Sequence, residues 1–512
     1  MKKIYILILC SIMAASLHAQ EGFGTYLRDI IQKQEKGILC MARTIEACGL
    51  CDSLDILMDY EYHTRYMTGM IPTSIMDYSM GYPAYAPEYR RYGYTLFAET
   101  DDFWLSQGID PNDPEMLKKL TEWILDNHQY SDNDQFTTDD NYESEYNLLN
   151  QWATYHLLPH RLVPNKLVNH VNEFGYNINA PNRLSIPVTE YYVTMGKRRL
   201  LKLYESAESN GVYINRFPHL DDGRQGSGHE IACDPDKEGI RVDRENYIMD
   251  CPNAIVYPIS QPLAYNDAVA DNLHRTRLRF DITGLFPELS NNDIRIKKSS
   301  MQKDQYVYIP STNTYPYLSD LTISEESNMI YYNAYNMNWC NLNGDEVQVK
   351  GRYDITLRLP PVPRRGVYEI RYKMLSNASR GIAQVYFGTD KEKLSPAGMP
   401  IDFTKQASDM HVGWQNDTGD DYADQLVDTE MHFNGVMKGA RSITQNGTQT
   451  ERSSYQNIIR YIIVRQTMDP NQTYYLRFKS VLDSSTSSFF MDYLEFCPKE
   501  VYDNPEKPED IW

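Results

Sequence analysis

Beyond its first nineteen residues, the sequence lacks any run of about 20 apolar residues, the length that a membrane-spanning helix needs. It also lacks an excess of positive charge, because 50 Lys and Arg residues stand against 70 Asp and Glu residues, for a formal net charge of −20. Such acidity disfavours binding to nucleic acid and to anionic lipid. We therefore expect no transmembrane segment in the mature chain and no nucleic-acid partner.

Familiar catalytic motifs are missing as well. The sequence has no Gly-x-Ser-x-Gly elbow, no His-Glu-x-x-His pair, no P-loop and no Rossmann glycine fingerprint. We therefore predict a protein that is not an enzyme, with no catalytic residues and no cofactor.

Metal-binding patterns are incomplete. In the acidic segment 130–145 the carboxylates have the spacing of a calcium loop, but Phe136 and Thr137 stand where an oxygen ligand and a glycine are needed. No metal site is predicted there. Asp492 and Glu495 in the last predicted strand leave a structural calcium ion open, although no motif supports it.

Cysteine is scarce, with eight residues in 512. Cys48 and Cys51 have C-x-x-C spacing, but no second pair completes a zinc set. We expect both to be buried thiols on one helix, not joined to each other. Cys233 and Cys251 could pair in an oxidising compartment, and the sequence leaves that pairing open.

The start of the chain has the pattern of a secretory signal peptide. Two lysines precede a short apolar run, and small residues lead to Ala19. Leu9 is bulkier than the residue expected before a lipidated cysteine, so cleavage after Ala19 is favoured over lipidation of Cys10. We expect residues 1–19 to be removed and the mature chain to be exported to the periplasm, the outer-membrane surface or the extracellular space.

The spacing of apolar residues changes near residue 275. Before it, apolar residues recur at helical spacing in the segments 38–50, 116–125 and 150–158. Gly49, where the first of these patterns stops, predicts a helix C-cap. After it, residues alternate as in strands with one buried and one wet face, in the segments 354–359, 367–372 and 474–478.

This change predicts two domains. We expect an α+β domain over residues 20–275 and an all-β jelly-roll sandwich over residues 276–512. We also expect dense contacts on each side of residue 275 and sparse contacts across it.

Segments of the first half resemble a fasciclin domain. Segment 37–54 resembles the opening helices of that family, and "YTLFAETD" at 94–101 resembles its first motif, with Glu99 where a proline is usual. Segment 148–159 matches the Tyr-His motif, and "NAIVYPI" at 253–259 resembles the second motif, a closing strand that pairs near the first.

The resemblance covers roughly residues 25–270 and is interrupted by an insertion around 221–250. It implies a fasciclin-like fold and, by analogy with animal members, a role in adhesion. Residues at the acidic turn can accept backbone N–H groups where the next helix begins, and the Tyr-His pair is expected to pack in the core. These structural motif residues are Thr100, Asp101, Tyr155 and His156.

The second half resembles a C-terminal module that follows fasciclin domains in secreted proteins of gut Bacteroidetes. The resemblance lies in segments 277–289, 365–388 and 489–496. It implies a galactose-binding-like jelly roll and a place near outer-membrane nutrient-uptake proteins. Such jelly rolls often bind carbohydrate, which is an expectation from fold analogy alone.

These features predict a secreted cell-envelope binding or adhesion protein that captures a glycan or a protein ligand, or contacts an uptake complex. A glycan-active enzyme and a purely structural accessory subunit are the alternatives. For the ligand site we predict Arg380, Trp414 and Asn416, because an indole covers an apolar sugar face while a guanidinium and an amide bond to hydroxyls. The alternative is that Trp414 fills the core and Arg380 caps a turn.

Overall fold

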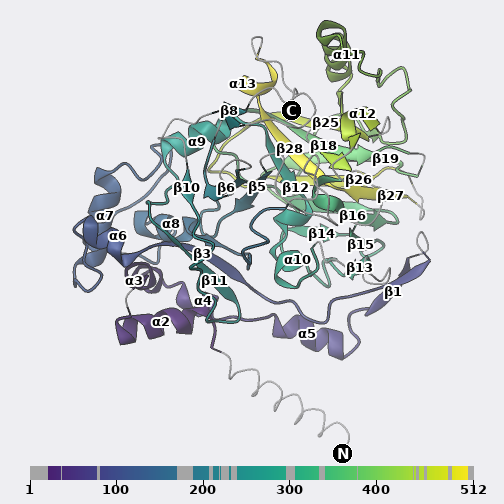
Figure 1. Ribbon diagram of the computed structural model, residues 1–512. Coiled ribbons are helices and arrows are strands. Elements are labelled where there is room, and N and C mark those ends of the chain that lie inside the picture. Colours follow the sequence, from purple (N-terminus) through teal and green to yellow (C-terminus); the bar gives the residue numbers. More distant parts are fainter. Residues whose placement is uncertain are drawn as a thin grey trace, which may run out of the picture.

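A computed structural model gives the fold of the protein (Figure 1). It describes residues 21–35, 37–77, 81–169, 188–206, 211–217, 219–220, 230–231, 239–295, 306–333, 341–377, 379–441, 443–445, 449–454, 458–482 and 487–504. The expected signal peptide, Cys233 and most of the insertion at 221–250 lie outside these residues.

Helices dominate the N-terminal part, drawn in purple and blue at one end of the molecule in Figure 1. They are α2 (Phe23–Lys33), α3 (Leu39–Ala47), α4 (Cys51–Leu54), α5 (Tyr60–Met67), α6 (Asp101–Ser106), α7 (Met116–Asp126) and α8 (Leu148–Tyr155). The helices expected in segments 38–50, 116–125 and 150–158 are confirmed in their main part, although α3 ends at Ala47 and Leu157–Leu158 form a short strand.

The C-terminal end of α3 explains why the helical spacing of apolar residues stops at Gly49. Gly49 has φ +69°, in the left-handed region that favours glycine. The N–H of Gly49 donates to the carbonyl of Glu46, and the N–H of Leu50 donates to that of Ile45, as in a Schellman motif. The predicted C-cap is confirmed.

A three-stranded sheet lies beside these helices, in the order β11 (Ala254–Ile259), β3 (Tyr94–Glu99) and β4 (Leu157–Leu158). β11 runs parallel to β3, with Ala254 opposite Tyr94 and Ile259 opposite Glu99. The prediction that segment 253–259 pairs near the first motif is confirmed. Every residue of β3 is buried, because helices and strands cover both of its faces.

Antiparallel sheets make up most of the remainder. A four-stranded sheet has the order β10 (Ile240–Arg241), β7 (Val212–Ile214), β6 (Leu200–Glu205), β5 (Val188–Val193). A five-stranded sheet has the order β12 (Leu278–Asp281), β28 (Tyr493–Pro498), β18 (Gly366–Leu375), β25 (Ile458–Met468), β22 (Val436–Lys438).

Two six-stranded sheets follow. One has the order β1 (Ser74–Asp77), β2 (Tyr82–Tyr85), β13 (Tyr306–Ile309), β15 (Asn328–Asn333), β16 (Asp345–Lys350), β27 (Ser488–Met491). The other has the order β14 (Leu321–Ile323), β17 (Asp354–Arg358), β26 (Tyr475–Ser480), β19 (Ile382–Gly388), β20 (Ser395–Pro396), with β21 (Ile401–Asp402) also on β19.

Short elements complete the described fold. The helices are α9 (Asp267–His274), α10 (Pro287–Asn291), α11 (Asp421–Phe433), α12 (Glu451–Ser454) and α13 (Lys499–Tyr502), with 3-10 turns η2 (Thr283–Leu285) and η4 (Leu342–Gly344). Two small ribbons pair β8 (His219–Leu220) with β9 (Glu230–Ile231) and β23 (Thr444–Gln445) with β24 (Gln449–Thr450).

The two halves of the chain share one sheet and one core. β2 pairs in parallel with β13, with Tyr85 opposite Val307, and Figure 1 shows α5 and β1 beneath the strands of the second half. One hydrophobic cluster runs from Tyr62 to Phe496 and takes side chains from both sides of residue 275. The expectation of sparse contacts across residue 275 is therefore wrong. The chain is a mixed α+β protein with several antiparallel sheets.

Alternation along the strands is only partly as expected. β17 and the start of β26 alternate between buried and half-buried residues, as predicted. In β18, however, Glu369, Arg371 and Lys373 are buried although their face was expected to be wet. Glu369 is bonded by His432 of α11 and pairs with Arg371, and Lys373 pairs with Asp492 and Glu451. The charged face is therefore an internal layer.

The opposite face of β18 packs against the other sheets. Tyr372 contacts Phe478 of β26 at 5.2 Å between ring centroids and stacks on Phe489 of β27 at 5.2 Å and 8°. Aromatic contacts of this kind hold two sheets face to face.

The described cysteines are buried free thiols: Cys40, Cys48, Cys51, Cys251 and Cys497. Cys48 is the C-cap of α3 and Cys51 begins α4, so the expectation that both lie on one helix is wrong, although they are not joined. None of the described helices is long and apolar enough to cross a membrane.

Candidate functional site

The acidic turn after β3 holds two helices together. Thr100 is the N-cap of α6, where its side chain accepts the N–H of Phe103, as predicted. Asp101 does not cap α6. Its carboxylate instead accepts the N–H groups of Gly37, Leu39 and Cys40 at 2.6, 3.0 and 2.9 Å, at the start of α3.

Glu99 and His156 form a fully buried pair. His156 Nε2 lies 3.0 Å from Glu99 Oε1, which also accepts the N–H of Leu263 at 2.8 Å. The other ring nitrogen, Nδ1, is 2.8 Å from the carbonyl oxygen of Trp152. Both side chains are 0 % exposed, so the pair ties β3, α8 and the chain after β11 together inside the protein.

Tyr155 is equally internal. Its hydroxyl donates to the carbonyl of Leu200 at 3.1 Å and accepts from the Asn215 amide at 2.9 Å. Burial raises the pKa of Tyr155 well above its usual range. A neutral, fully bonded phenol is suited to packing, and Tyr155 is only 2 % exposed.

Arg380, a predicted ligand residue, is only 4 % exposed. Its guanidinium donates to the carbonyl of Leu375 at 2.9 Å and to Ser488 at 2.8 Å, and lies 3.8 Å from the ring centre of Phe490. Burial lowers the pKa of Arg380 to about 10. The expectation that Arg380 is presented to a ligand is wrong, because its donors are used inside the protein.

Trp414 and Asn416 lie elsewhere. Trp414 is half-buried against the main core, its indole nitrogen is buried, and Lys438 Nζ lies 5.7 Å from its ring centre. Asn416 is exposed. Among the described residues no hydrogen bond or ring contact joins Arg380 to Trp414 or Asn416, and with Arg380 buried the predicted three-residue site is not presented to a ligand.

The carboxylates considered for calcium have other partners. Asp492 lies 2.6 Å from Lys373 Nζ, and Glu495 lies 2.9 Å from Arg460. The described residues contain no group of three or more His, Cys, Asp or Glu side chains placed to hold a metal ion. Buried lysine and arginine therefore stand beside the two carboxylates for which a structural calcium ion was left open.

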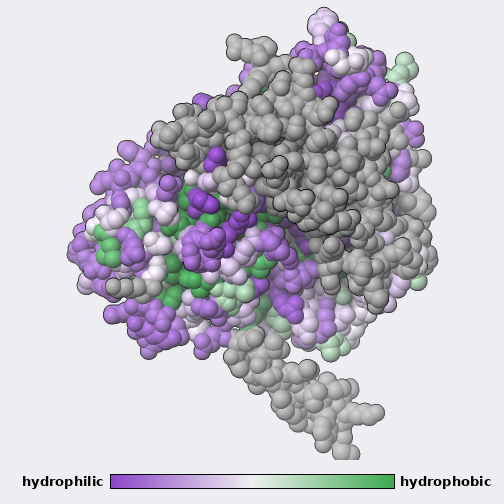
Figure 2. Space-filling view, viewed as in Figure 1, coloured by the Kyte–Doolittle hydropathy of each residue, from purple (hydrophilic) through white to green (hydrophobic). Residues whose placement is uncertain are grey.

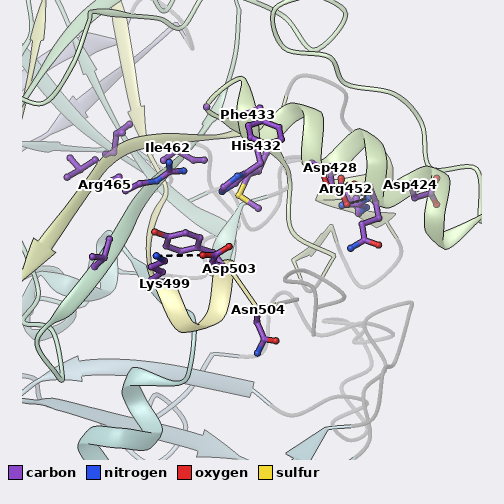
Figure 3. Close-up of a pocket in the computed structure, with 18 of the residues that line it drawn as sticks. Asp424, Asp428, His432, Phe433, Arg452, Ile462, Arg465, Lys499, Asp503 and Asn504 are labelled. Carbon is purple, nitrogen blue, oxygen red and sulfur yellow. Dashed lines mark hydrogen bonds and ion pairs between the residues drawn. The ribbon is translucent and has the colours of Figure 1, made fainter. Parts of the chain in front are cut away.

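A cavity of about 1050 Å³ lies between α11, β25 and α13, and we call it the α11 cavity. Figure 3 shows His432 and Phe433 at the end of α11, across from the Lys499–Asp503 ion pair of α13. Phe433 is 85 % exposed although it lines the cavity. Sequence analysis missed this site because its walls are joined only in the folded chain.

Glu369 lies beneath the floor of the α11 cavity. Its carboxylate is bonded by Arg371 at 2.6 Å, by Arg465 Nε at 3.0 Å and by His432 Nε2 at 3.1 Å. Burial alone would raise the pKa of Glu369, but the His432 hydrogen bond and the Arg371 charge lower it to about 2. A carboxylate that is ionised at neutral pH therefore orients the imidazole and the guanidinium that face the cavity.

Acidic residues fix α11 in place as the cavity wall. Asp420 is the N-cap and accepts the N–H groups of Tyr422 and Ala423, both at 3.0 Å. Asp428 pairs with the nearly buried Arg452 at 2.8 Å. Figure 2 shows the surface of α11, at the upper right, to be mainly hydrophilic. The helix start could have been found from Asp420 and the acids after it, a pattern suited to a helix N-terminus.

Comparisons with known proteins show little similarity. No family model matches the sequence, and no curated protein matches it. Among solved structures, an exo-β-1,3-galactanase from Phanerochaete chrysosporium with galactose is similar at 10 % identity and a TM-score of 0.16, over 60 % of this chain and 68 % of that one. A likeness at that score supports neither a fold nor a function for this chain.

Proposed function

We propose that this protein is a non-catalytic binding protein of the cell envelope that captures a glycan in the α11 cavity. The observation that carries the proposal is the open cavity of about 1050 Å³, walled by an exposed phenylalanine on one side and by charged and hydrogen-bonding side chains on the other. Ligand sites commonly have volumes of roughly 300–1,000 Å³. This one has room for an oligosaccharide.

The cavity contains the groups that a sugar chain needs. Phe433 and Tyr502 offer ring faces, and an aromatic contact adds roughly 0.5–1.5 kcal/mol beyond the area that it buries. Gln425 and Asp428 on α11 offer amide and carboxylate groups for hydroxyls, and Arg465 offers a guanidinium that Glu369 already orients. Pre-orientation reduces the entropy lost on binding.

The same proposal includes the finer fold and the location. We propose a fasciclin-like unit within residues 25–270, a jelly-roll sandwich in the second half, and export through the signal peptide at 1–19. The parallel pairing of β3 with β11 and the face-to-face contact of β18 with β26 support the two fold assignments. Contact with outer-membrane uptake proteins would place the captured glycan near its transporter.

The test is calorimetric titration of the full chain with glycans identified on a glycan array. Phe433→Ala is expected to weaken binding at least tenfold, about 1.4 kcal/mol, because it removes the ring at the cavity edge. The control is Tyr422→Ala, since Tyr422 lies on the same helix and is 73 % exposed but does not line the cavity. Equal loss in both variants, or none in Phe433→Ala, contradicts the site.

A glycan-active enzyme is the second candidate, and the His432–Glu369 pair favours it. A histidine that bonds a buried carboxylate through Nε2 can take a proton through Nδ1, as a general base does. Release of reducing sugar by the wild-type chain and its loss in His432→Gln would establish an enzyme. A chain that binds no glycan on the array would instead be a structural accessory subunit.

A further inference from the structure

A second, smaller cavity of about 270 Å³ lies where the two halves of the chain meet. Its walls come from the end of β2 and the chain after it, from the end of α10 and from β13, which Figure 1 places in the lower part of the molecule. We call it the β2 cleft. It shares no lining residue with the α11 cavity.

Arg91 is the distinctive side chain of the β2 cleft. Its guanidinium lies 4.6 Å from the ring centre of Tyr89, and that ring stacks on His63 at 4.7 Å and 12°. The backbone is fixed as well, because the N–H of Arg91 donates to Asn292 Oδ1 at 2.8 Å. The Asn292 amide in turn donates to the carbonyl of Glu288 at 2.8 Å.

The neighbouring Arg90 shows the contrast. Arg90 is 9 % exposed and pairs with Asp59 and Glu288, each at 2.9 Å. Arg91 is exposed and has no carboxylate partner among the described residues. Arg90 therefore pairs inside the fold, whereas the guanidinium of Arg91 lies over the ring of Tyr89 and pairs with no described carboxylate. An oriented, unpaired guanidinium is a receptor for a carboxylate or a similar planar anion.

Two further side chains of the β2 cleft, Tyr85 and Glu88, indicate what kind of molecule carries the anionic group. Tyr85 is 55 % exposed and offers the flat face of a phenol, on which the apolar face of a pyranose ring can stack. Glu88 is exposed and bonded by the Tyr89 hydroxyl, which raises the pKa of Tyr89. Its carboxylate can accept hydrogen bonds from sugar hydroxyls. The remaining acid, Asp293, already pairs with Lys166 at 3.0 Å.

We propose that the β2 cleft binds one carboxylated sugar unit, a uronic acid, independently of the glycan proposed for the α11 cavity. The uronate carboxylate pairs with Arg91, the ring lies on Tyr85, and a hydroxyl donates to Glu88. The volume of about 270 Å³ is near the lower end of ligand sites and suits a single ring. A neutral sugar would leave Arg91 unpaired, and a bare anion would leave Tyr85 uncovered.

The test uses the full chain and three probes, D-galacturonate, D-galactose and acetate, titrated by ligand-observed NMR at low salt. We expect galacturonate to bind at least tenfold more tightly than either of the others. Arg91→Gln is expected to weaken galacturonate at least tenfold. Arg365→Gln, which removes an exposed arginine outside both cavities, should leave its affinity unchanged. Tyr85→Ala should weaken galacturonate and galactose alike.

Several results would overturn the proposal. One is equal affinity for galacturonate and galactose. A second is acetate that binds as tightly as galacturonate, and a third is an Arg91→Gln variant whose affinity for galacturonate is unchanged. Phe433→Ala distinguishes the two cavities. Loss of galacturonate binding in that variant would place the sugar in the α11 cavity and refute the proposed site in the β2 cleft. Retained binding supports a second, separate site.

Discussion

Replacing Asp101 with alanine is expected to loosen the start of α3 from the turn after β3. The Asp101 carboxylate accepts the N–H groups of Gly37, Leu39 and Cys40, and the residue is 4 % exposed. Leu39 and Cys40 begin α3, where N–H groups have no intrahelical partner, and Gly37 lies just before the N-cap residue Ile38. Water can replace the carboxylate only at Gly37, which is the least buried of the three.

The magnitude follows from the two donors that stay buried. Leaving a buried donor unsatisfied costs roughly 1–3 kcal/mol, so the two N–H groups of Leu39 and Cys40 together cost about 3 kcal/mol. The neighbouring Asp102 is exposed in the first turn of α6. Asp102→Ala loses only a favourable interaction with the helix dipole, roughly 0.5 kcal/mol, which makes it the matched control.

Urea unfolding followed by tryptophan fluorescence measures this loss where it occurs. Trp104, Trp123 and Trp152 belong to the N-terminal cluster around α3, and Trp104 contacts both of the others edge to face. The fluorescence transition should move to lower urea in Asp101→Ala and change little in Asp102→Ala. A free-energy difference below about 1 kcal/mol between the variants would refute the assignment of Asp101 as the cap of α3.

Two further predictions concern ionisation. Because the pKa of Glu369 is lowered from 4.5 to about 2, its ion pairs contribute fully above about pH 4.5 and are lost as the pH falls towards 2. The difference corresponds to roughly 3 kcal/mol. In that range the free energy of unfolding of Glu369→Gln should therefore fall less steeply with decreasing pH than that of the wild-type chain. Identical pH profiles for the two proteins would contradict the prediction. Burial raises the pKa of Cys48 to about 12, so iodoacetamide at pH 8 should spare it in the native chain and label it in urea. Native labelling, or a Cys48–Cys51 bridge in the intact mass, would count against this.

Local rules explain what could be predicted from the sequence. The spacing around α3 and Gly49 depends on residues a few positions apart, and the alternation of β17 depends on neighbours in one strand. Such short-range preferences survive in the fold because tertiary contacts agree with them. The N-cap at Thr100 could be predicted for the same reason.

Long-range pairing explains what could not be predicted. Asp101 was expected to serve the helix that follows it, yet it serves α3, more than sixty residues earlier. The pairing of β2 with β13 joins Tyr85 to Val307, and no local pattern indicates such a partner. Arg380 and Asp492 are residue types that often bind a ligand or a cation. In the fold, however, Arg380 donates to a backbone carbonyl and Asp492 pairs with a buried lysine.

The buried charged face of β18 explains why the alternation predicted for that strand fails, and it lies beside the α11 cavity through Glu369. Glu495 on β28 lies between Arg460 of β25 and Arg279 of β12, which outweigh its burial and hold its pKa well below the usual range. Removing one partner of such a pair costs roughly 3–5 kcal/mol, because the other charge stays buried and unpaired. The layer is therefore fixed in one arrangement. Since Glu369 belongs to it, the groups that Glu369 orients enter the α11 cavity in fixed positions before any ligand arrives.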